Sequence, residues 1–295
     1  MNMDLFDDEM FEDEPQQPER PPRGPRKRRR GSGETAKRVL VALPWIAFAI
    51  AITVAGGPVF ALAMGGIGVV AIREYAGIAE RFRPLVIPAY VSVVALVAAA
   101  YLGSAFNVLY VIAATFPLLF AFAANAKHRE GATVSLGVTL LGVLWIGIPL
   151  AHAVLLRELP QHGAALLIDV LVGTFVADTA AYATGRMFGS HKIAPNLSPN
   201  KTIEGLIGGF VIGTMGFWFA GLYQDWLSGV DALMIGAAVA AVAPIGDLFE
   251  SMLKRDLGTK DTGTLFGPHG GLLDRLDAVF FTVVIGYYLS VAVVY

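Results

Sequence analysis

The chain has 295 residues, of which 55% are hydrophobic and only 16% are charged, and its mean hydropathy is +0.61. Soluble domains carry about 25% charged residues, so the composition excludes an ordinary soluble protein and favours one embedded in a membrane. The net charge is only -2, and both signs are concentrated in residues 1–38. The absence of cysteine excludes a disulfide framework, a cysteine-ligated zinc site and a thiol nucleophile.

Residues 1–36 differ in composition from the rest of the chain. An acidic start is followed by a proline-rich stretch and by a basic run at residues 26–30. Such a segment cannot bury enough apolar surface to fold, so we predict a disordered tail. A basic run can bind nucleic acid or anionic lipid. Its position beside the first apolar segment favours a topology anchor, and we expect no nucleic-acid partner.

The apolar segments begin with residues 39–72, which contain no charged residue. A single helix of that length would extend about 50 Å, whereas the hydrocarbon core of a bilayer is about 30 Å thick. Gly56, Gly57 and Pro58 interrupt the segment, so we predict two membrane spans. Residues 84–126 are uncharged as well and are interrupted at Gly103, which predicts two more.

Further along the chain, charged residues separate single apolar segments. We expect membrane spans at 131–156, 164–184, 205–224, 232–251 and 278–295. Together with the first four, these predict about nine transmembrane helices. The fold class is therefore all-α, as a polytopic integral membrane protein, with residues 37–295 forming the membrane-embedded domain.

The distribution of basic residues predicts the orientation of these spans. If the N-terminus is cytoplasmic and there are nine spans, then all of the 22 Lys and Arg residues except Arg157 lie in cytoplasmic segments. Such an excess is the positive-inside signal. We therefore expect a protein of the cell membrane with a cytoplasmic N-terminus and its C-terminus on the opposite side.

Two long hydrophilic segments on the predicted cytoplasmic side are candidates for function. The first, residues 178–205, places Asp178 and Arg186 two helical turns apart. Ser198 and Pro199 predict a turn before a helix start, with Lys201 beside it. A helix N-terminus with a nearby lysine suits a phosphate group. The alternative is a set of capping and snorkelling residues at the membrane edge.

The second segment, residues 246–277, is dense in charge and glycine. One helical stripe carries Asp247, Glu250, Ser251 and Lys254. Asp274 and Asp277 begin the last span, which returns across the membrane and places them at the depth of Asp247. Several unpaired carboxylates would repel one another there, so a cation is expected between them. Oxygen ligands favour Mg²⁺ that bridges phosphate oxygens.

The same residues allow a structural interpretation, in which Lys254, Arg255 and Arg275 form a salt-bridge network with the carboxylates. His269, beside two glycines, is more typical of a hydrogen-bonding loop residue than of a metal ligand. The chain has no phosphate-binding loop of the G-x-x-x-x-G-K-[ST] form. A phosphate monoester is already an anionic nucleophile, so positioning and electrostatic screening would suffice for transfer to it.

The second segment resembles the signature of the phosphatidate cytidylyltransferases. The matching positions are Ser251, Leu253, Lys254, Arg255, Lys260, Asp261, Gly263, Phe266, Gly267, His269, Gly270, Gly271, Leu272, Asp274, Arg275, Leu276 and Asp277. The first segment is similar to the same family at Asp178, Ala181, Tyr182, Gly185, Arg186, Ser198, Pro199, Lys201, Thr202, Glu204 and Gly205. The resemblance covers about residues 170–280. Two features depart from the family pattern: the order of Gly267 and Pro268, and the charged N-terminal tail.

This resemblance implies a nucleotidyltransferase of phospholipid biosynthesis that uses CTP and phosphatidic acid to make CDP-diacylglycerol and pyrophosphate. It implies a cytoplasm-facing polar cavity, dependence on Mg²⁺ and a homodimer. Metal ligands are expected at Asp247 and Asp274, and less directly at Asp178 and Asp277. The catalytic candidates are Asp247, Asp274, Lys254, Lys260 and Arg275, and the substrate-binding candidates are Arg186, Ser198, Lys201 and His269.

Three other functions stay open from the sequence. A related membrane lipid cytidylyltransferase or an isoprenoid alcohol kinase would use similar chemistry on another lipid. A membrane transporter would belong to a different class, but transporters place charge near the midplane in repeated halves. Here the acids gather toward one membrane side, and no internal repeat is visible.

Overall fold

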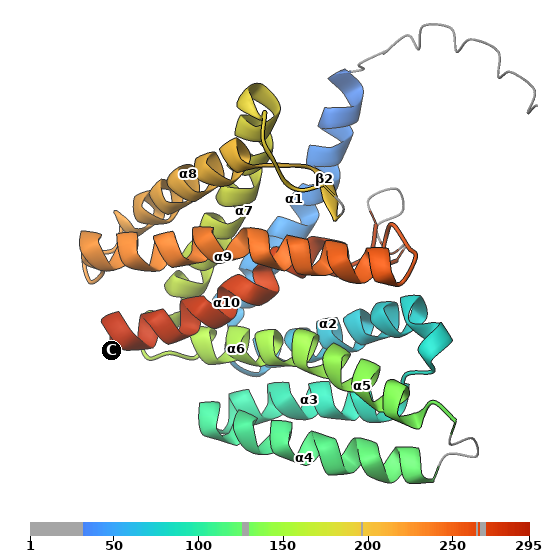
Figure 1. Ribbon diagram of the computed structural model, residues 1–295. Coiled ribbons are helices and arrows are strands. Elements are labelled where there is room, and N and C mark those ends of the chain that lie inside the picture. Colours follow the sequence, from blue (N-terminus) through green and yellow to red (C-terminus); the bar gives the residue numbers. More distant parts are fainter. Residues whose placement is uncertain (1–31, 126–129, 196, 264, 266–269) are drawn as a thin grey trace, which may run out of the picture. The chain divides into compact units, whose positions relative to one another are not determined.

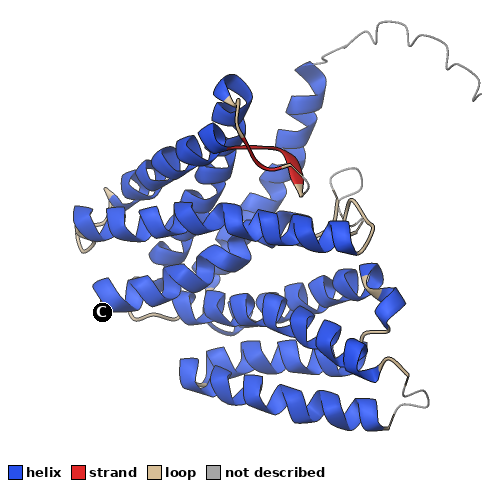
Figure 2. Cartoon of the chain, in the orientation of Figure 1, coloured by secondary structure: helices blue, strands red, loops and turns tan. Residues whose placement is uncertain are grey.

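The computed structural model describes residues 32–125, 130–195, 197–263, 265 and 270–295. Nearly all of this described chain is helical (Figure 2). The chain divides into two units, residues 1–45 and 46–295, and helix α1 (Ser32–Ala55) crosses the division. The end of the predicted tail, residues 32–36, lies within α1, and the rest of the tail lies outside the described residues.

After α1 the chain forms a series of helices and one small hairpin, drawn in Figure 1. The helices are α2 (Gly57–Ile78), the 3-10 helix η1 (Glu80–Phe82), α3 (Val86–Leu102), α4 (Ala105–Ala124), α5 (Ala132–Gly142), the π-helix η2 (Val143–Gly147), α6 (Ile148–Arg157), α7 (Gly163–Phe188), α8 (Ile203–Gly221), α9 (Gly229–Asp256) and α10 (Leu273–Val293). The strands are β1 (Lys192–Ala194) and β2 (Ser198–Thr202).

The lengths and compositions of these helices confirm the predicted all-α polytopic membrane class. Within the described residues, seven helices are long and apolar enough to cross a membrane, counting α5, η2 and α6 as one. Two shorter apolar helices, Pro44–Ala55 and Val86–Leu102, occupy two of the remaining predicted spans. The count of nine spans stays a prediction.

The first predicted interruption is confirmed at the turn between α1 and α2. Gly56 and Gly57 both have positive φ, of 61° and 51°, which disfavours other residue types. The carbonyl of Thr53 accepts a hydrogen bond from Arg157 Nε, and Glu158 Oε1 accepts one from Gly57 N at 3.0 Å. Arg157, the one basic residue predicted outside the cytoplasm, thus holds the end of α1 against the end of α6.

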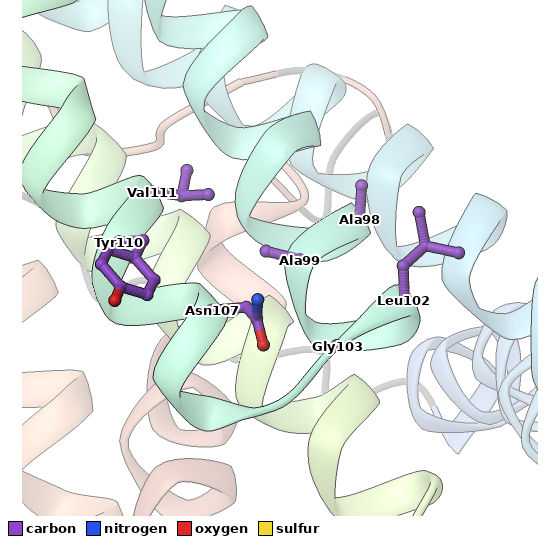
Figure 3. A pocket seen from close by; sticks show the side chains of 7 residues that line it. All are labelled: Ala98, Ala99, Leu102, Gly103, Asn107, Tyr110 and Val111. Atoms are coloured by element: carbon purple, nitrogen blue, oxygen red, sulfur yellow. The ribbon is translucent and has the colours of Figure 1, made fainter.

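The second predicted interruption, at Gly103, separates α3 from α4. Asn107 Oδ1 accepts a hydrogen bond from Ser104 N at 3.0 Å and so fixes the turn. A groove of about 280 Å³ opens beside it, between Leu102 and Tyr110 (Figure 3). No charged residue lines this groove. Its lining therefore provides no charged group that could bind a phosphate or a metal ion.

Within residues 46–295, the helices pack in two connected groups. Helices α7, α8, α9 and α10 pack against one another, while α2, α3, α4, α5 and α6 form the other group. Helix α10 also contacts α6 and α2 and joins the groups (Figure 1). Large buried side chains such as Ile146, Phe217 and Phe280 fill the shared core. The two hydrophilic segments of the sequence both belong to the α7–α10 group.

Small residues bring α7 and α8 into close contact. Gly205, Gly209 and Gly213 follow one another at intervals of one turn on the face of α8 that meets α7. A Cβ atom at Gly209 would lie 2.9 Å from the carbonyl oxygen of Ala177 and 2.8 Å from the Cβ of Ala181. In lipid, where apolar surface alone does not hold helices together, such backbone approach is a main source of packing energy.

A hairpin stands where the sequence predicted only a turn. Strands β1 and β2 pair antiparallel, with Lys192 opposite Thr202 and Ala194 opposite Ser198. Thr202 then caps α8, because its Oγ1 accepts a hydrogen bond from Gly205 N at 3.1 Å. Sequence alone missed the strands because they are short and polar. Their consequence is that Lys201 sits on a strand just before α8 begins.

We expect Gly209→Ala to lower the stability of the protein. The added Cβ atom would meet Ala177 and Ala181 at less than van der Waals distance, and such overpacking costs about 1–3 kcal/mol. Thermal unfolding of the purified protein in detergent measures the effect.

Gly65→Ala in α2 is the matched control, because an added Cβ atom there meets nothing within 4 Å. It should leave the unfolding temperature equal or higher, since alanine favours a helix over glycine. Equal unfolding temperatures for Gly209→Ala and the parent protein would contradict the close approach of α7 and α8.

Candidate functional site

The site begins with a salt bridge between the hairpin and α9. Lys201 Nζ lies 2.8 Å from Asp247 Oδ2 and donates a second hydrogen bond to the carbonyl oxygen of Pro244 at 3.2 Å. Ser251 Oγ approaches the other oxygen of Asp247 at 3.5 Å. The hairpin thereby places the ammonium group of Lys201, from the first predicted polar segment, beside the carboxylate of Asp247, from the second.

Two further carboxylates interact with this pair. Asp178, just past the middle of α7, interacts electrostatically with both Asp247 and Lys201. Asp277, in the first turns of α10, interacts with Asp247 and Asp178. Because a Cβ atom at Gly246 would lie 2.3 Å from the carbonyl oxygen of Asp277, the backbones of α9 and α10 nearly touch here. Carboxylates from three helices, α7, α9 and α10, therefore influence one another here.

A second group of charges lies further along α9, around Lys254. Its Nζ is 2.8 Å from Glu250 Oε2 and 2.8 Å from Asp274 Oδ1. Glu250 is only 1% exposed, and its Oε1 has no hydrogen-bond partner among the described residues. The salt-bridge network that the sequence allowed is thus present at Lys254, although it does not account for Asp178, Asp247 and Asp277.

Asp274 also holds the connection between α9 and α10. Its Oδ2 accepts hydrogen bonds from Thr262 N at 3.0 Å, Thr262 Oγ1 at 2.9 Å and Gly271 N at 2.7 Å. Both of its oxygens are therefore engaged, one by Lys254 and one by the connecting segment. A cation that bound Asp274 would have to share these oxygens with Lys254 and the connecting segment.

The two groups form one continuous site. Glu250 interacts electrostatically with Asp277 and with Asp274, which connects the groups around Lys201 and Lys254. Acidic side chains outnumber the two lysines in this set. Each charged side chain at membrane depth costs about 2.5–3.5 kcal/mol on insertion scales, so an excess of acids favours an additional cation.

The arrangement suits a cation that shares its ligands with a substrate. Among the described residues, no three His, Cys, Asp or Glu side chains form a ready-made metal centre. Mg²⁺ does not need one, because proteins often bind it through one or two carboxylates together with water and phosphate oxygens. Asp247, Asp178 and Asp277 carry carboxylate oxygens of this kind and stay the predicted metal ligands.

Among the described residues, Lys260, Arg186 and Ser198 are not part of the contacts given above. Lys260 and Arg275 are exposed. Arg186 is exposed and donates a hydrogen bond to the hydroxyl of Tyr182 at 2.9 Å, and Ser198 pairs with Ala194 in the hairpin. The predicted role of His269 falls outside the described residues. For these residues, catalysis and substrate binding stay predictions.

The structure adds residues that the sequence did not single out as site residues. Glu250 shares a helical stripe with Asp247 and Lys254, and that spacing was a usable signal. Glu74 is different, because it comes from α2 and accepts a hydrogen bond from Leu273 N at 3.1 Å through its Oε2. Its only signal in the sequence is an acidic residue close to the end of a long apolar segment.

Comparison with known proteins gives consistent similarities. A family model described as "Cytidylyltransferase family" matches residues 36–293. A phosphatidate cytidylyltransferase of Haemophilus influenzae is 40% identical over 125 residues, which cover 41% of this chain and 43% of that protein. One from Bacillus subtilis is 34% identical over 154 residues, covering 52% and 57% respectively.

A phosphatidate cytidylyltransferase of Synechocystis aligns along more of the chain. It is 28% identical over 292 residues, covering 86% of this chain and 96% of that protein. The chain spans only about half the length of the Haemophilus and Bacillus relatives in their alignments. The family model therefore extends the similarity well beyond residues 170–280, into the apolar helices of the first half.

We expect Lys201→Met to destabilise the protein. Loss of the ammonium group leaves Asp247 facing Asp178 and Asp277 without its cation. Hydrogen bonds to charged groups are worth about 1.5–3 kcal/mol, and the partial exposure of Asp247 reduces this to about 1–2 kcal/mol. Thermal unfolding in detergent at low Mg²⁺ measures the loss.

Lys192→Met makes the same change on the neighbouring strand, where the side chain is exposed, and should leave the unfolding temperature unchanged. If the two variants unfolded at the same temperature as the parent protein, the contact between Lys201 and Asp247 would have no role in stability.

Proposed function

The chain belongs to the cytidylyltransferase family, and from this premise we propose that it transfers a cytidylyl group from CTP to phosphatidic acid, giving CDP-diacylglycerol and pyrophosphate. The observation that carries the proposal is the pairing of Lys201 with Asp247, beside Asp178 and Asp277. It joins the two segments of the chain that resemble phosphatidate cytidylyltransferases. The proposed substrates, CTP and phosphatidic acid, are taken from the relatives that are named phosphatidate cytidylyltransferase.

The chemistry of the transfer fits the residues of the site. An oxygen of the lipid phosphate attacks the α-phosphorus of CTP, a new P–O bond forms, and the bond to the β-phosphate breaks as pyrophosphate leaves. The nucleophile is already an anion, so no strong general base is needed. The task of the protein is to align two anions and to screen their repulsion. Lys201 and Lys254 are two cations that can do so.

Mg²⁺ is part of the proposal. When bound, it would neutralise phosphate charge and stabilise the leaving pyrophosphate. Asp247, Asp178 and Asp277 are the residues we propose to hold it. Asp274 remains a candidate ligand, but its oxygens are engaged by Lys254, Thr262 and Gly271, so we propose that it first of all orders the connecting segment.

The orientation in the membrane follows from the distribution of basic residues. We propose that the N-terminus and the site face the cytoplasm, where CTP is present, and that the C-terminus lies on the other side. Phosphatidic acid would then enter laterally from the inner leaflet. A homodimer, which the family resemblance implies, remains part of the proposal and is testable by the mass of the protein in detergent.

A direct assay tests the function. Purified protein in detergent, incubated with labelled CTP, Mg²⁺ and phosphatidic acid, should form a lipid-linked cytidylate and release pyrophosphate. An isoprenoid phosphate in place of phosphatidic acid should give no product. Product from the isoprenoid phosphate alone would favour the related lipid cytidylyltransferase. Uptake of substrate into proteoliposomes without chemical change would favour a transporter, and no product with either lipid would refute the proposal.

We expect Asp247→Asn to lose at least about a hundredfold in kcat/KM at the Mg²⁺ concentration that saturates the parent protein. The amide keeps the shape of the side chain but lacks the negative charge that attracts Mg²⁺. A titration of activity with Mg²⁺ should show a higher half-saturating concentration.

Asp225→Asn is the control, because Asp225 is exposed beyond the opposite end of α9. Asp225→Asn should have the same kcat/KM and the same half-saturating Mg²⁺ concentration as the parent protein. An Asp247→Asn variant that folds and keeps full CTP incorporation with the parent's Mg²⁺ dependence would exclude Asp247 as a ligand.

A further inference from the structure

Helix α2, which carries none of the signature residues, reaches the connection between α9 and α10. Near its C-terminal end, Glu74 Oε2 accepts a hydrogen bond from Leu273 N at 3.1 Å. Leu273 is the first residue of α10, and Asp274 follows it directly. The N-terminal N–H groups of a helix have no partner within the helix, and a carboxylate satisfies them well. Glu74 therefore fixes the start of the helix that carries Asp274 and Asp277.

The carboxylate of Glu74 also packs against the backbone of the connection itself. A Cβ atom at Gly263 would lie 2.6 Å from Glu74 Oε1, and one at Gly271 would lie 2.5 Å from Oε2. These two glycines leave room that any other residue would fill. Oε1 is buried and has no hydrogen-bond partner among the described residues. A carboxylate oxygen that is buried without a partner is costly, so this position of Glu74 calls for an explanation.

A second contact from the same region holds the other end of the connection. Arg81, in η1 directly after α2, donates a hydrogen bond from Nη2 to the carbonyl oxygen of Asp256 at 2.6 Å. Asp256 is the last residue of α9. An arginine at a helix C-terminus also satisfies the helix dipole. Glu74 and Arg81 thus hold the two ends of the segment that joins α9 to α10.

Asp274 contacts the same segment. Its Oδ2 accepts hydrogen bonds from Thr262 and Gly271, and Gly271 is one of the two glycines that contact Glu74. Two carboxylates, Glu74 from α2 and Asp274 from α10, therefore hold the described residues of this segment. A shift of the segment would move Asp274, and with Asp274 it would move Lys254.

We propose that Glu74 is a positioning residue of the site. It acts through the backbone of Leu273 and the two glycines, and it sets the place of Asp274 and Asp277 relative to Asp247. Arg81 completes this role at the other end of the connection. The effect on catalysis rests on the proposed function, whereas the effect on the segment does not. The apolar first half of the chain thereby takes part in forming the site.

Local proteolysis tests the positioning without any assay of activity. Lys260 is exposed in the connection, and Lys192 is exposed in the hairpin. In Glu74→Ala, trypsin should cleave after Lys260 about tenfold faster than in the parent protein, because loss of one charged hydrogen bond makes local opening easier. Cleavage after Lys192 should stay unchanged. Mass spectrometry of the fragments gives both rates in one experiment.

Two further variants and a control sharpen this test. Glu74→Gln keeps an oxygen that can accept from Leu273 N, so it should be cleaved nearly as slowly as the parent protein. Arg81→Ala should behave like Glu74→Ala, because it releases the other end. Glu80→Ala, an exposed neighbour in η1, should have no effect. If Glu74→Ala does not fold, Arg81→Ala and Glu74→Gln still decide the question.

Kinetics test the consequence for catalysis. Displacement of reacting groups by about 1 Å can cost about a hundredfold, so kcat of Glu74→Ala should fall about tenfold to a hundredfold, with KM for CTP changing much less. Glu74→Gln should restore most of kcat.

Each contrary result has a distinct meaning. Parent-like cleavage and kcat in Glu74→Ala would overturn the proposal. Equal acceleration after Lys192 and Lys260 would overturn it too, because Glu74 would then be a general stabilising residue. Faster cleavage after Lys260 with unchanged kcat would refute the catalytic role. Absence of cytidylyl transfer in every protein, the parent included, would refute the proposed function, while the cleavage rates would still decide the positioning.

Discussion

Charge pairing at membrane depth is the constraint on which the rest of this molecule depends. Carboxylates in membrane-spanning helices cannot remain alone, since each costs several kcal/mol to bury and like charges repel. Lys201 offsets Asp247, and Lys254 lies between Glu250 and Asp274. The lysines do not balance all the acids present. The remaining negative charge is the physical reason for the proposal that the site binds a cation together with a phosphate ligand.

This pairing is possible only because the helices approach one another very closely. Gly246 lets the backbone of α9 meet that of α10 beside Asp277, and Gly209 lets α8 meet α7 beside Ala177. With a larger residue at position 246, α9 and α10 could not approach so closely beside Asp277. Small residues at helix contacts thus bear on where the charges lie as well as on packing.

The first half of the chain provides more than membrane anchoring. Glu74 at the end of α2 and Arg81 in η1 contact the two ends of the α9–α10 connection. The connection bears much of the signature motif, and these two contacts lie at its described ends. The match of the family model to residues 36–293 agrees with a single functional unit that includes these early helices.

The sequence by itself determined the membrane class, the helix interruptions at Gly56 and Gly103, and the two segments that hold the polar site, because these depend on local composition and on motifs. Only the tertiary structure decided which charges meet. In lipid most faces of a helix are apolar, so the hydrophobic pattern says little about which faces pack together. The hairpin that brings Lys201 to Asp247 is too short to be predicted, and the reach of Glu74 to Leu273 joins distant parts of the chain.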